Sequence, residues 1–395
     1  MKTIYDNGIK NIERFYEATD FTAALKSAIF EALKKVNYMM ETFGDGFAPH
    51  NSIDNFYHVD TNEDGWNQGF YTGILWLSYE LTGDSKYSKL ALSHLPSYEK
   101  RITEKIGVDH HDMGFLFIPS CVAAYKLTKN PDARRIALLA ADNLMSRYHK
   151  KGGFIQAWGK LGAKESYRLI IDCLLNIPLL YWAAAETGDE RYKAAGYTHF
   201  RSTIENAIRS DASTFHTFYF DIETGMPLNG VTAQGASDDS CWARGQAWGI
   251  YGLMMTMKYV ADPDACDVCK KLINYFLSFL PKDYVPFWDL SFTDGDNEPR
   301  DSSSAAIAVC GISELIKYLP DEDNYKNLYK NAVNLIMNSL YENYSTKNTA
   351  ESNGLLLHAT YGKPQNSGVD ECNIWGDYFY MEELVRLSKN WDLYW

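Results

Sequence analysis

The sequence has little that would let it bind a polyanion or enter a membrane. Its 38 Lys and Arg are outnumbered by 51 Asp and Glu, which leaves a formal net charge of −13 without a basic cluster. A nucleic acid or an anionic bilayer would repel such a chain, so we expect neither as a partner. No stretch reaches the roughly 18 uninterrupted apolar residues of a spanning helix. Residues 1–15 also lack the apolar run of a signal peptide, so we expect a cytoplasmic protein.

Several catalytic signatures are missing as well. The sequence has no phosphate-binding glycine loop, no GxSxG elbow and no dinucleotide fingerprint, and we expect no cofactor. Its seven cysteines are an odd number, and Cys121, Cys173, Cys241 and Cys310 adjoin apolar or helical runs, which predicts reduced, buried thiols. Cys266 and Cys269 form a CxxC without a second pair, which indicates neither zinc nor redox chemistry.

Aromatic residues, by contrast, are abundant. Phe, Trp and Tyr make up 14% of the chain, with 28 Tyr and 10 Trp, and several lie in Gly-rich polar segments. Large rings near polar groups suit stacking on the faces of sugars. For any single ring, filling a helical core is the competing interpretation.

A polar loop with an acidic residue followed by an apolar helix recurs six times along the chain, and five of the six continue into a short turn and an amphipathic helix. A matching amphipathic helix at residues 21–41 precedes the first unit. Alternating apolar and amphipathic helices close most simply into a double ring with the apolar set inside. We therefore predict an all-α fold, an (α/α)6 barrel of six helical hairpins, as a single domain over residues 1–395. Residues 216–227 predict one short β-hairpin on a loop. The acidic residues of the six loops are Asp64, Asp112, Asp172, Asp239, Asp301 and Asp377.

In such a barrel, the loops that lead into the inner helices gather at one end, where we expect these acids to converge. Asp172 is flanked by Ile, Leu and Cys, a setting that raises the pKa of a carboxyl group. Pro178 fits the first turn of the following helix, and Asp112 has the same placement before Pro119. Two carboxylates with separated pKa values are typical of enzymes that act on glycosidic bonds. The alternative for Asp172 is a buried aspartate satisfied by backbone donors.

Two further features stand near these acids. His110 and His111 make a metal site conceivable, but they lack the i, i+4 spacing of helical ligands, and we expect no metal. In the segment 234–252, Arg244 and Trp248 share a helix face, which offers a guanidinium group and an aromatic platform to a uronic acid. On this interpretation Arg244→Ala weakens substrate binding more than stability. The alternative is an ion pair of Arg244 with Asp238 or Asp239.

These segments together resemble glycoside hydrolase family 88, the unsaturated glucuronyl hydrolases, over nearly the whole chain. The string SDDSCWARGQAWG is the most specific match, and HHDMGFLF and IIDCLLNIPLLYWAAAETGD occur in family order. The resemblance implies an (α/α)6 barrel that hydrates the C4=C5 double bond of a terminal uronic acid made by a polysaccharide lyase. An aspartic acid protonates C4, water adds at C5, and the resulting hemiketal opens and expels the neighbouring sugar.

The resemblance also implies roles for individual residues. Asp172 matches the acid, which also helps to activate the water, and Asp112 matches a second essential acidic position that orients substrate hydroxyls. The implied partner is an unsaturated uronyl di- or oligosaccharide of the glycosaminoglycan type. The positions that match the sugar site are Trp66, Trp158, His216, Gln234, Trp242, Arg244, Trp248 and Tyr361.

Three other functions remain open at this stage. They are an unsaturated rhamnogalacturonyl hydrolase, an inverting (α/α)6 glycosidase that acts on saturated sugars, and a carbohydrate-binding protein without catalysis. The sugar and linkage next to the uronic acid, the sulfation preference and the oligomeric state also remain open. Lys363 and Ser367 would be candidates to contact a sulfate.

Overall fold

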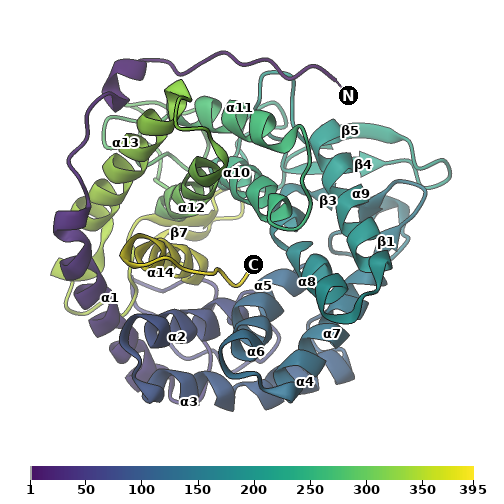
Figure 1. Cartoon of the computed structure of the whole chain (residues 1–395), viewed down its shortest axis with the longest axis horizontal. Helices are drawn as coiled ribbons and strands as arrows, with labels where there is room; N and C mark the ends of the chain where they lie inside the picture. Colours follow the sequence, from purple (N-terminus) through teal and green to yellow (C-terminus); the bar gives the residue numbers. More distant parts are fainter. Residues whose placement is uncertain (1) are drawn as a thin grey trace.

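The computed structural model describes residues 2–395, and in it the helices form two concentric rings (Figure 1). The fold is the predicted (α/α)6 barrel. The second inner helix is interrupted near Pro119 and consists of α5, a π-helical turn η2 and α6. The inner ring comprises α2 (Gln68–Thr82), α5 (Met113–Phe117), η2 (Ile118–Val122), α6 (Ala123–Thr128), α8 (Pro178–Thr187), α10 (Ala243–Met257), α12 (Ser302–Tyr318) and α14 (Ile374–Ser388). The outer ring comprises α1 (Thr22–Phe43), α3 (Ser85–Ser93), α4 (Leu95–Glu104), α7 (Pro131–Met145), α9 (Glu190–Asn206), α11 (Ala265–Ser278) and α13 (Asn324–Ser339).

Burial separates the two rings in the way that the sequence pattern predicts. In α10 every residue from Ala243 to Thr256 is buried, because the helix is surrounded by its neighbours. In α11 only one stripe is buried, and the other face meets solvent. The turns between the rings stop and restart helices as expected. Gly83 and Gly188 end inner helices at φ 70° and 74°, and Asp84 and Asp189 then cap the next helices with their side chains.

The ring closes between its first and last helices. Helix α14 packs against α1 and α2, so the hairpin that completes the barrel joins the two ends of the chain. Main-chain contacts reinforce this closure, since Ser52 N donates to Cys372 O at 2.9 Å and Asn51 forms a β-bridge with Asn373. The phenol of Tyr57 donates to Asp377 at 3.0 Å.

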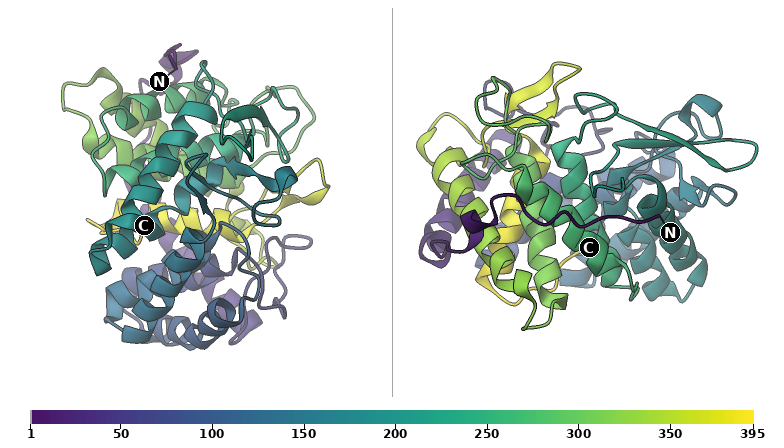
Figure 2. Two further views of the ribbon diagram at one scale, coloured as in Figure 1. Left: turned by 90° about the vertical axis from the view of Figure 1, so that its right-hand side faces the viewer. Right: turned by 90° about the horizontal axis from the view of Figure 1, so that it is seen from above.

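Short strands lie in the loops. The predicted hairpin is present as β4 (Thr217–Phe220) and β5 (Pro227–Val231), and β3 (Arg168–Ile170) adds an antiparallel third strand that the sequence pattern did not reveal. The β4–β5 and β6–β7 hairpins project at the same end of the barrel (Figure 2, right). The remaining strands and turns of helix are β1 (Tyr148–His149), β2 (Phe154–Ile155), β6 (Ala359–Gly362), β7 (Ser367–Glu371), η1 (Ile12–Phe15), η3 (Lys164–Ser166), η4 (Ile171–Leu175), η5 (Leu340–Tyr344) and η6 (Thr346–Asn348).

The structure also bears on two expectations from composition. Within residues 2–395, no helix combines the length and the apolar character that a bilayer crossing requires. All seven cysteines are free, and all except the half-buried Cys266 are buried.

Candidate active site

A cavity of about 190 Å³ opens at the end of the barrel where the inner helices α5 and α10 begin. Every site residue expected from the sequence lines it, and so do His111, Phe115, Ile170 and Ala233, which were not expected as site residues. The expected residues in its lining are Trp66, Asp112, Trp158, Asp172, His216, Gln234, Trp242, Arg244, Trp248 and Tyr361.

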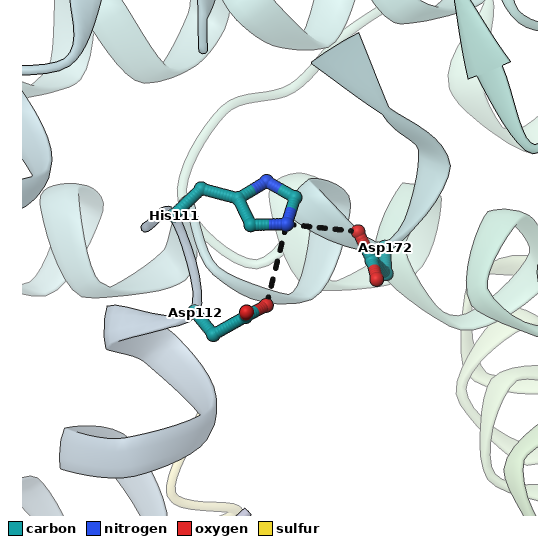
Figure 3. A group of neighbouring side chains, drawn as sticks. All are labelled: His111, Asp112 and Asp172. Carbon is teal, nitrogen blue, oxygen red and sulfur yellow. Dashed lines mark ion pairs between the residues drawn. The ribbon is translucent and has the colours of Figure 1, made fainter. Parts of the chain in front are cut away.

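The two carboxyl groups are brought together by local chain geometry. Asp112 directly precedes α5, and Asp172 lies in η4, which leads into α8 at Pro178 as predicted. Between them stands His111, whose Nε2 is 3.3 Å from Oδ1 of Asp112 and 3.3 Å from Oδ1 of Asp172 (Figure 3). Asn176 braces the same group, because its amide nitrogen lies 3.5 Å from Oδ1 of Asp112 and its amide oxygen accepts from Phe115 N at 2.9 Å.

The environments of the two carboxyl groups push their pKa values apart. Burial raises the pKa of Asp172 well above its usual range, and the nearby charge of Asp112 raises it further, against the opposing effect of Arg244. Burial also disfavours the charged form of Asp112, but the contacts with His111 and His110 outweigh burial and lower the pKa of Asp112. The site therefore holds a protonated acid beside an ionised one, as the sequence predicts.

His111 is neutral in this arrangement. Burial lowers the pKa of His111 to about 4, so the ring carries one proton at neutral pH. Its Nδ1 is buried without a hydrogen-bond partner, whereas Nε2 faces two carboxyl oxygens. Oδ1 of Asp172 is likewise buried without a hydrogen-bond partner, so the two 3.3 Å approaches of Nε2 are close contacts, and a proton on Nε2 would face both acids.

Arg244 lies in the cavity wall, but its partner differs from both expected ones. Its Nη1 donates to Asp301 at 2.6 Å and to Thr360 O at 2.6 Å. Asp239 is exposed, and Asp238 accepts instead from Thr232 N at 2.7 Å. The expected wall ion pair thus exists with Asp301, while Arg244 and Trp248 both face the cavity as the helix spacing predicted.

Neutral polar groups and aromatic rings complete the lining. Burial lowers the pKa of His216 to about 3, which leaves it neutral, and its Nδ1 lies 2.7 Å from Thr217 Oγ1. Gln234 donates from Nε2 to Tyr361 O at 2.9 Å. Trp66 stacks on Trp375 with 5.2 Å between ring centres, which fixes an aromatic wall.

The expectation that all six loop acids converge on the site was wrong. Only Asp112 and Asp172 line the cavity, whereas Asp64 and Asp239 are exposed to solvent. Asp301 pairs with Arg244, and Asp377 lies inside the first turn of α14, where it accepts from Leu356 N at 2.9 Å. Of the six, only Asp301 caps the following helix with its side chain, so the recurrence of aspartate does not mark a shared chemical role. Lys363 and Ser367 lie on the β6–β7 hairpin, outside the cavity lining.

The central cluster is also the one place in the described part of the chain with the ligand types and spacing of a metal site. Ligand atoms of His111, Asp112 and Asp172 all lie within 4.8 Å of one another, a grouping that the adjacent histidines alone did not reveal. A metal requires deprotonated carboxylates, and in the metal-free site burial and the charge of Asp112 raise the pKa of Asp172 and so favour its protonated form. The absence of a metal stays a prediction.

Comparison with known proteins gives consistent matches over the full length. The profile of Glycosyl Hydrolase Family 88 matches residues 34–390. The unsaturated chondroitin disaccharide hydrolase of Streptococcus pneumoniae is 47% identical over 100% of both chains, and the unsaturated glucuronyl hydrolase of Bacillus sp. (strain GL1) is 38% identical over 94% of this chain and 98% of its own. The crystal structure of the unsaturated glucuronyl hydrolase from Streptococcus agalactiae matches with a TM-score of 0.98 and 48% identity, covering 100% of both chains. A mutant of that enzyme in complex with dGlcA-GalNAc6S matches with a TM-score of 0.90 at 44% identity over 100% of both chains.

Proposed function

This chain belongs to glycoside hydrolase family 88, and from that premise we propose how its cavity carries out the reaction and on which substrates. The protein is a hydrolase that releases 4,5-unsaturated uronic acid from the non-reducing end of lyase-generated, glycosaminoglycan-type oligosaccharides. Unsaturated chondroitin disaccharides are the substrates that we propose first, because the relatives from three Streptococcus species are hydrolases of these disaccharides.

The observation that carries the mechanism is the pair of carboxyl groups with opposed pKa shifts on either side of one imidazole nitrogen. Asp172 holds a proton at neutral pH and gives it to C4 of the double bond. The electron pair of C4=C5 forms the new C–H bond, and positive charge develops at C5 and the ring oxygen. Water then bonds to C5 and returns one proton to the Asp172 carboxylate, which restores the acid.

The product of hydration is a hemiketal at C5. As the bond from C5 to the ring oxygen breaks, the hydroxyl proton passes through water to that oxygen, and C5 becomes a ketone. The former ring oxygen now stands at C1 as a hemiacetal, which collapses to an aldehyde and expels the neighbouring sugar as an alcohol. The enzyme therefore cleaves a glycosidic bond without direct attack at C1, which differs from both standard routes with paired carboxylates.

Asp112 acts beside this acid as an anion. Its charge helps to keep the proton on Asp172 and stabilises the positive charge that develops at C5. Its free acceptor capacity also suits a substrate hydroxyl, so we assign it the orientation of the reacting ring. We assign His111 a proton on Nε2, which lies 3.3 Å from an oxygen of each carboxyl group and would favour their close spacing.

The remaining lining residues bind the sugar. Trp66, Trp158 and Trp248 offer flat apolar faces, while His216 and Gln234 offer neutral polar groups. Arg244 already spends donors on Asp301, Thr360 O and Tyr361 O, so it meets a substrate carboxylate with only part of its guanidinium group. The part of the Arg244 charge that Asp301 does not neutralise would help to hold an anionic sugar ring next to the ionised Asp112.

The test is the ultraviolet absorbance of the conjugated double bond. Purified protein is incubated with unsaturated disaccharides of chondroitin, hyaluronan and heparin, and the expected result is a loss of absorbance with the chondroitin set. In D2O one deuterium should appear at C4 of the released acid. Cleavage that leaves the absorbance unchanged would instead indicate hydrolysis at C1, and activity confined to a pectin-derived disaccharide would indicate the rhamnogalacturonyl type.

Two broader expectations belong with this proposal. We propose that residues 1–395 work as one catalytic domain, because the ring is complete only when α14 packs against α1.

We also propose the cytoplasm as the site of action, a compartment that keeps thiols reduced and so suits seven free cysteines.

A further inference from the structure

Arg168 lies behind the cavity lining, against the lining residue Trp158, and forms no ion pair with the described residues. Among the ion pairs formed within residues 2–395, none reaches its guanidinium group, whereas the buried Arg147 pairs with Asp109 and Arg244 pairs with Asp301. One donor, Nη1, is engaged by the hydroxyl of Tyr219. Nε is buried without a hydrogen-bond partner, so one edge of the guanidinium group is unsatisfied.

The strand that carries Arg168 aims it at the cavity side. In β3, residues two apart share a face, so Arg168 and Ile170 point to the same side of the sheet, and Ile170 lines the cavity. The register of β3 against β4 sets Arg168 opposite Tyr219 and explains the contact with its hydroxyl. The positive charge of Arg168 is also felt inside the cavity, where it contributes to the lowered pKa of His216.

A tryptophan of the cavity wall packs directly on this arginine. The guanidinium carbon of Arg168 lies 3.8 Å from the ring centre of Trp158. Trp158 is 44% exposed, whereas the side chains of Asp112 and Asp172 are only 12% and 19% exposed. Trp158 therefore stands nearer the opening than the two acids, where a sugar that follows the unsaturated ring could reach it.

The local charge differs in sign from that of the whole chain. The segment 158–168 carries Lys160, Lys164 and Arg168 against the single acid Glu165, in a chain with a net charge of −13. Lys160 and Lys164 are both exposed. An anionic group near this rim meets attraction there and repulsion over most of the remaining surface.

We propose that Arg168, held against Trp158, binds an anionic group on the sugars that follow the unsaturated uronic acid. The inference rests on the proposed function and adds a residue that sets its substrate preference. A planar guanidinium edge matches an oxyanion with two parallel hydrogen bonds, and a sulfate ester and a second carboxylate share this chemistry. Either group would supply acceptors for the donor edge that the protein leaves unsatisfied.

The experiment compares catalytic efficiency on matched substrates. One arm uses unsaturated chondroitin disaccharides without sulfate, with 4-sulfate and with 6-sulfate. A second arm compares the unsaturated hyaluronan tetrasaccharide, which carries another carboxylate, with its disaccharide. In Arg168→Gln, the ratio of kcat/KM for the charged substrate to that for its less charged counterpart should fall about threefold to tenfold, as expected for lost charge-assisted hydrogen bonds. The arm in which the ratio falls identifies the anion.

Two variants serve as controls. Arg191→Gln removes an exposed arginine from outer helix α9 and should leave both ratios unchanged. Arg168→Lys keeps the charge but loses the planar edge, and should retain part of the preference. High salt should also reduce the preference of the unmodified protein, because this rim is open to screening.

Two outcomes would overturn the inference. In the first, Arg168→Gln lowers kcat/KM equally on every substrate, which would mean that Arg168 only holds Trp158 in place. In the second, neither ratio changes. If the unmodified protein hydrates none of the substrates, the proposed function has failed instead. Tryptophan fluorescence titrations with sulfated and unsulfated disaccharides then still decide the inference, since Arg168→Gln should abolish any preference for the sulfated ligand.

Discussion

Arg244 and Asp301 form a buried ion pair that links two inner helices at the mouth of the barrel. Their side chains are only 3% and 0% exposed, and 2.6 Å separates Nη1 from Oδ2. Arg244 stands in the first turn of α10, and Asp301 caps α12 by accepting from Ser303 N at 3.2 Å. Arg244, which lines the cavity, thus also connects two inner helices.

This pair changes what Arg244→Ala is expected to do. The substitution leaves the Asp301 charge buried without a partner, which costs about 3–5 kcal/mol of unfolding free energy. Urea unfolding should show this loss together with weaker substrate binding, so we now expect Arg244→Ala to affect stability as well as binding. In a double-mutant cycle with Asp301→Asn, the two losses should be clearly less than additive. Additive losses would contradict the coupling.

Asp172→Asn tests the proton donor. The amide resembles the protonated carboxyl group in shape, so we expect the fold and substrate binding to persist. The rate of absorbance loss should drop by about 100- to 10,000-fold, the range of a positioned acid–base group. Asp64→Asn, in an exposed loop, is the matched control and should keep full activity. Near-normal turnover in Asp172→Asn would remove Asp172 from the mechanism.

The raised pKa of Asp172 also predicts a pH-dependent stability difference. An acid whose pKa is higher in the folded than in the unfolded chain stabilises the fold below its unfolded pKa, and this contribution is lost as pH rises through the folded pKa. The amide introduced by Asp172→Asn cannot ionise. The Tm of Asp172→Asn minus that of the unmodified protein should therefore increase from acid to alkaline pH. A constant difference would indicate that Asp172 is not protonated in the native state.

Asp112→Asn should lower the pKa of Asp172, because after burial the charge of Asp112 is the main cause that raises it. Infrared difference spectra can follow the band of the protonated carboxyl group without any need for activity. That band should disappear at a lower pH in Asp112→Asn than in the unmodified protein. If the midpoint is the same in both, the two groups are not electrostatically coupled.

His111 is expected to act as a positioning residue for the two acids. His111→Phe removes the Nε2 donor and its lowering effect on the pKa of Asp112. The acid limb of the kcat/KM profile should then move to higher pH, and kcat should fall. His111→Gln keeps an N–H donor and should recover part of both effects. A shared loss of Tm with an unmoved pH profile would assign His111 a purely structural role.

The barrel could be predicted from the sequence because its pattern is local and repeated. An inner helix such as α10 is buried on all sides, while an outer helix such as α11 is buried along one stripe. The distribution of apolar residues in each segment therefore shows to which ring the helix belongs. The ten expected site residues all line one cavity: Asp112 and Arg244 adjoin the starts of inner helices, whereas Trp158, His216, Gln234 and Tyr361 lie in loops or strands and were expected from the family resemblance. Strand β3, with three residues, is too short to leave a pattern.

The partners of the site residues could not be predicted in the same way. Asp301 reaches Arg244 through the approach of α10 and α12, and His111 meets Asp172 through the approach of η4 to the start of α5. Neither of these contacts can be predicted from the sequence of a single segment, because each joins two segments that are distant along the chain. The six similar loop acids were misleading for a related reason, since capping a helix and donating a proton both favour aspartate at the same position.

The closure of the ring between α1 and α14 affects how the protein folds while it is being synthesised. During synthesis, the largely apolar surfaces of α2 and α12 stay uncovered until α14 has emerged, because α14 packs against both. Such surfaces favour aggregation of a half-made chain. A ribosome-bound chain that is stalled before residue 374 should therefore bind chaperones and be degraded by proteases. Resistance to proteolysis should appear only after α14 has been synthesised, and in a single step.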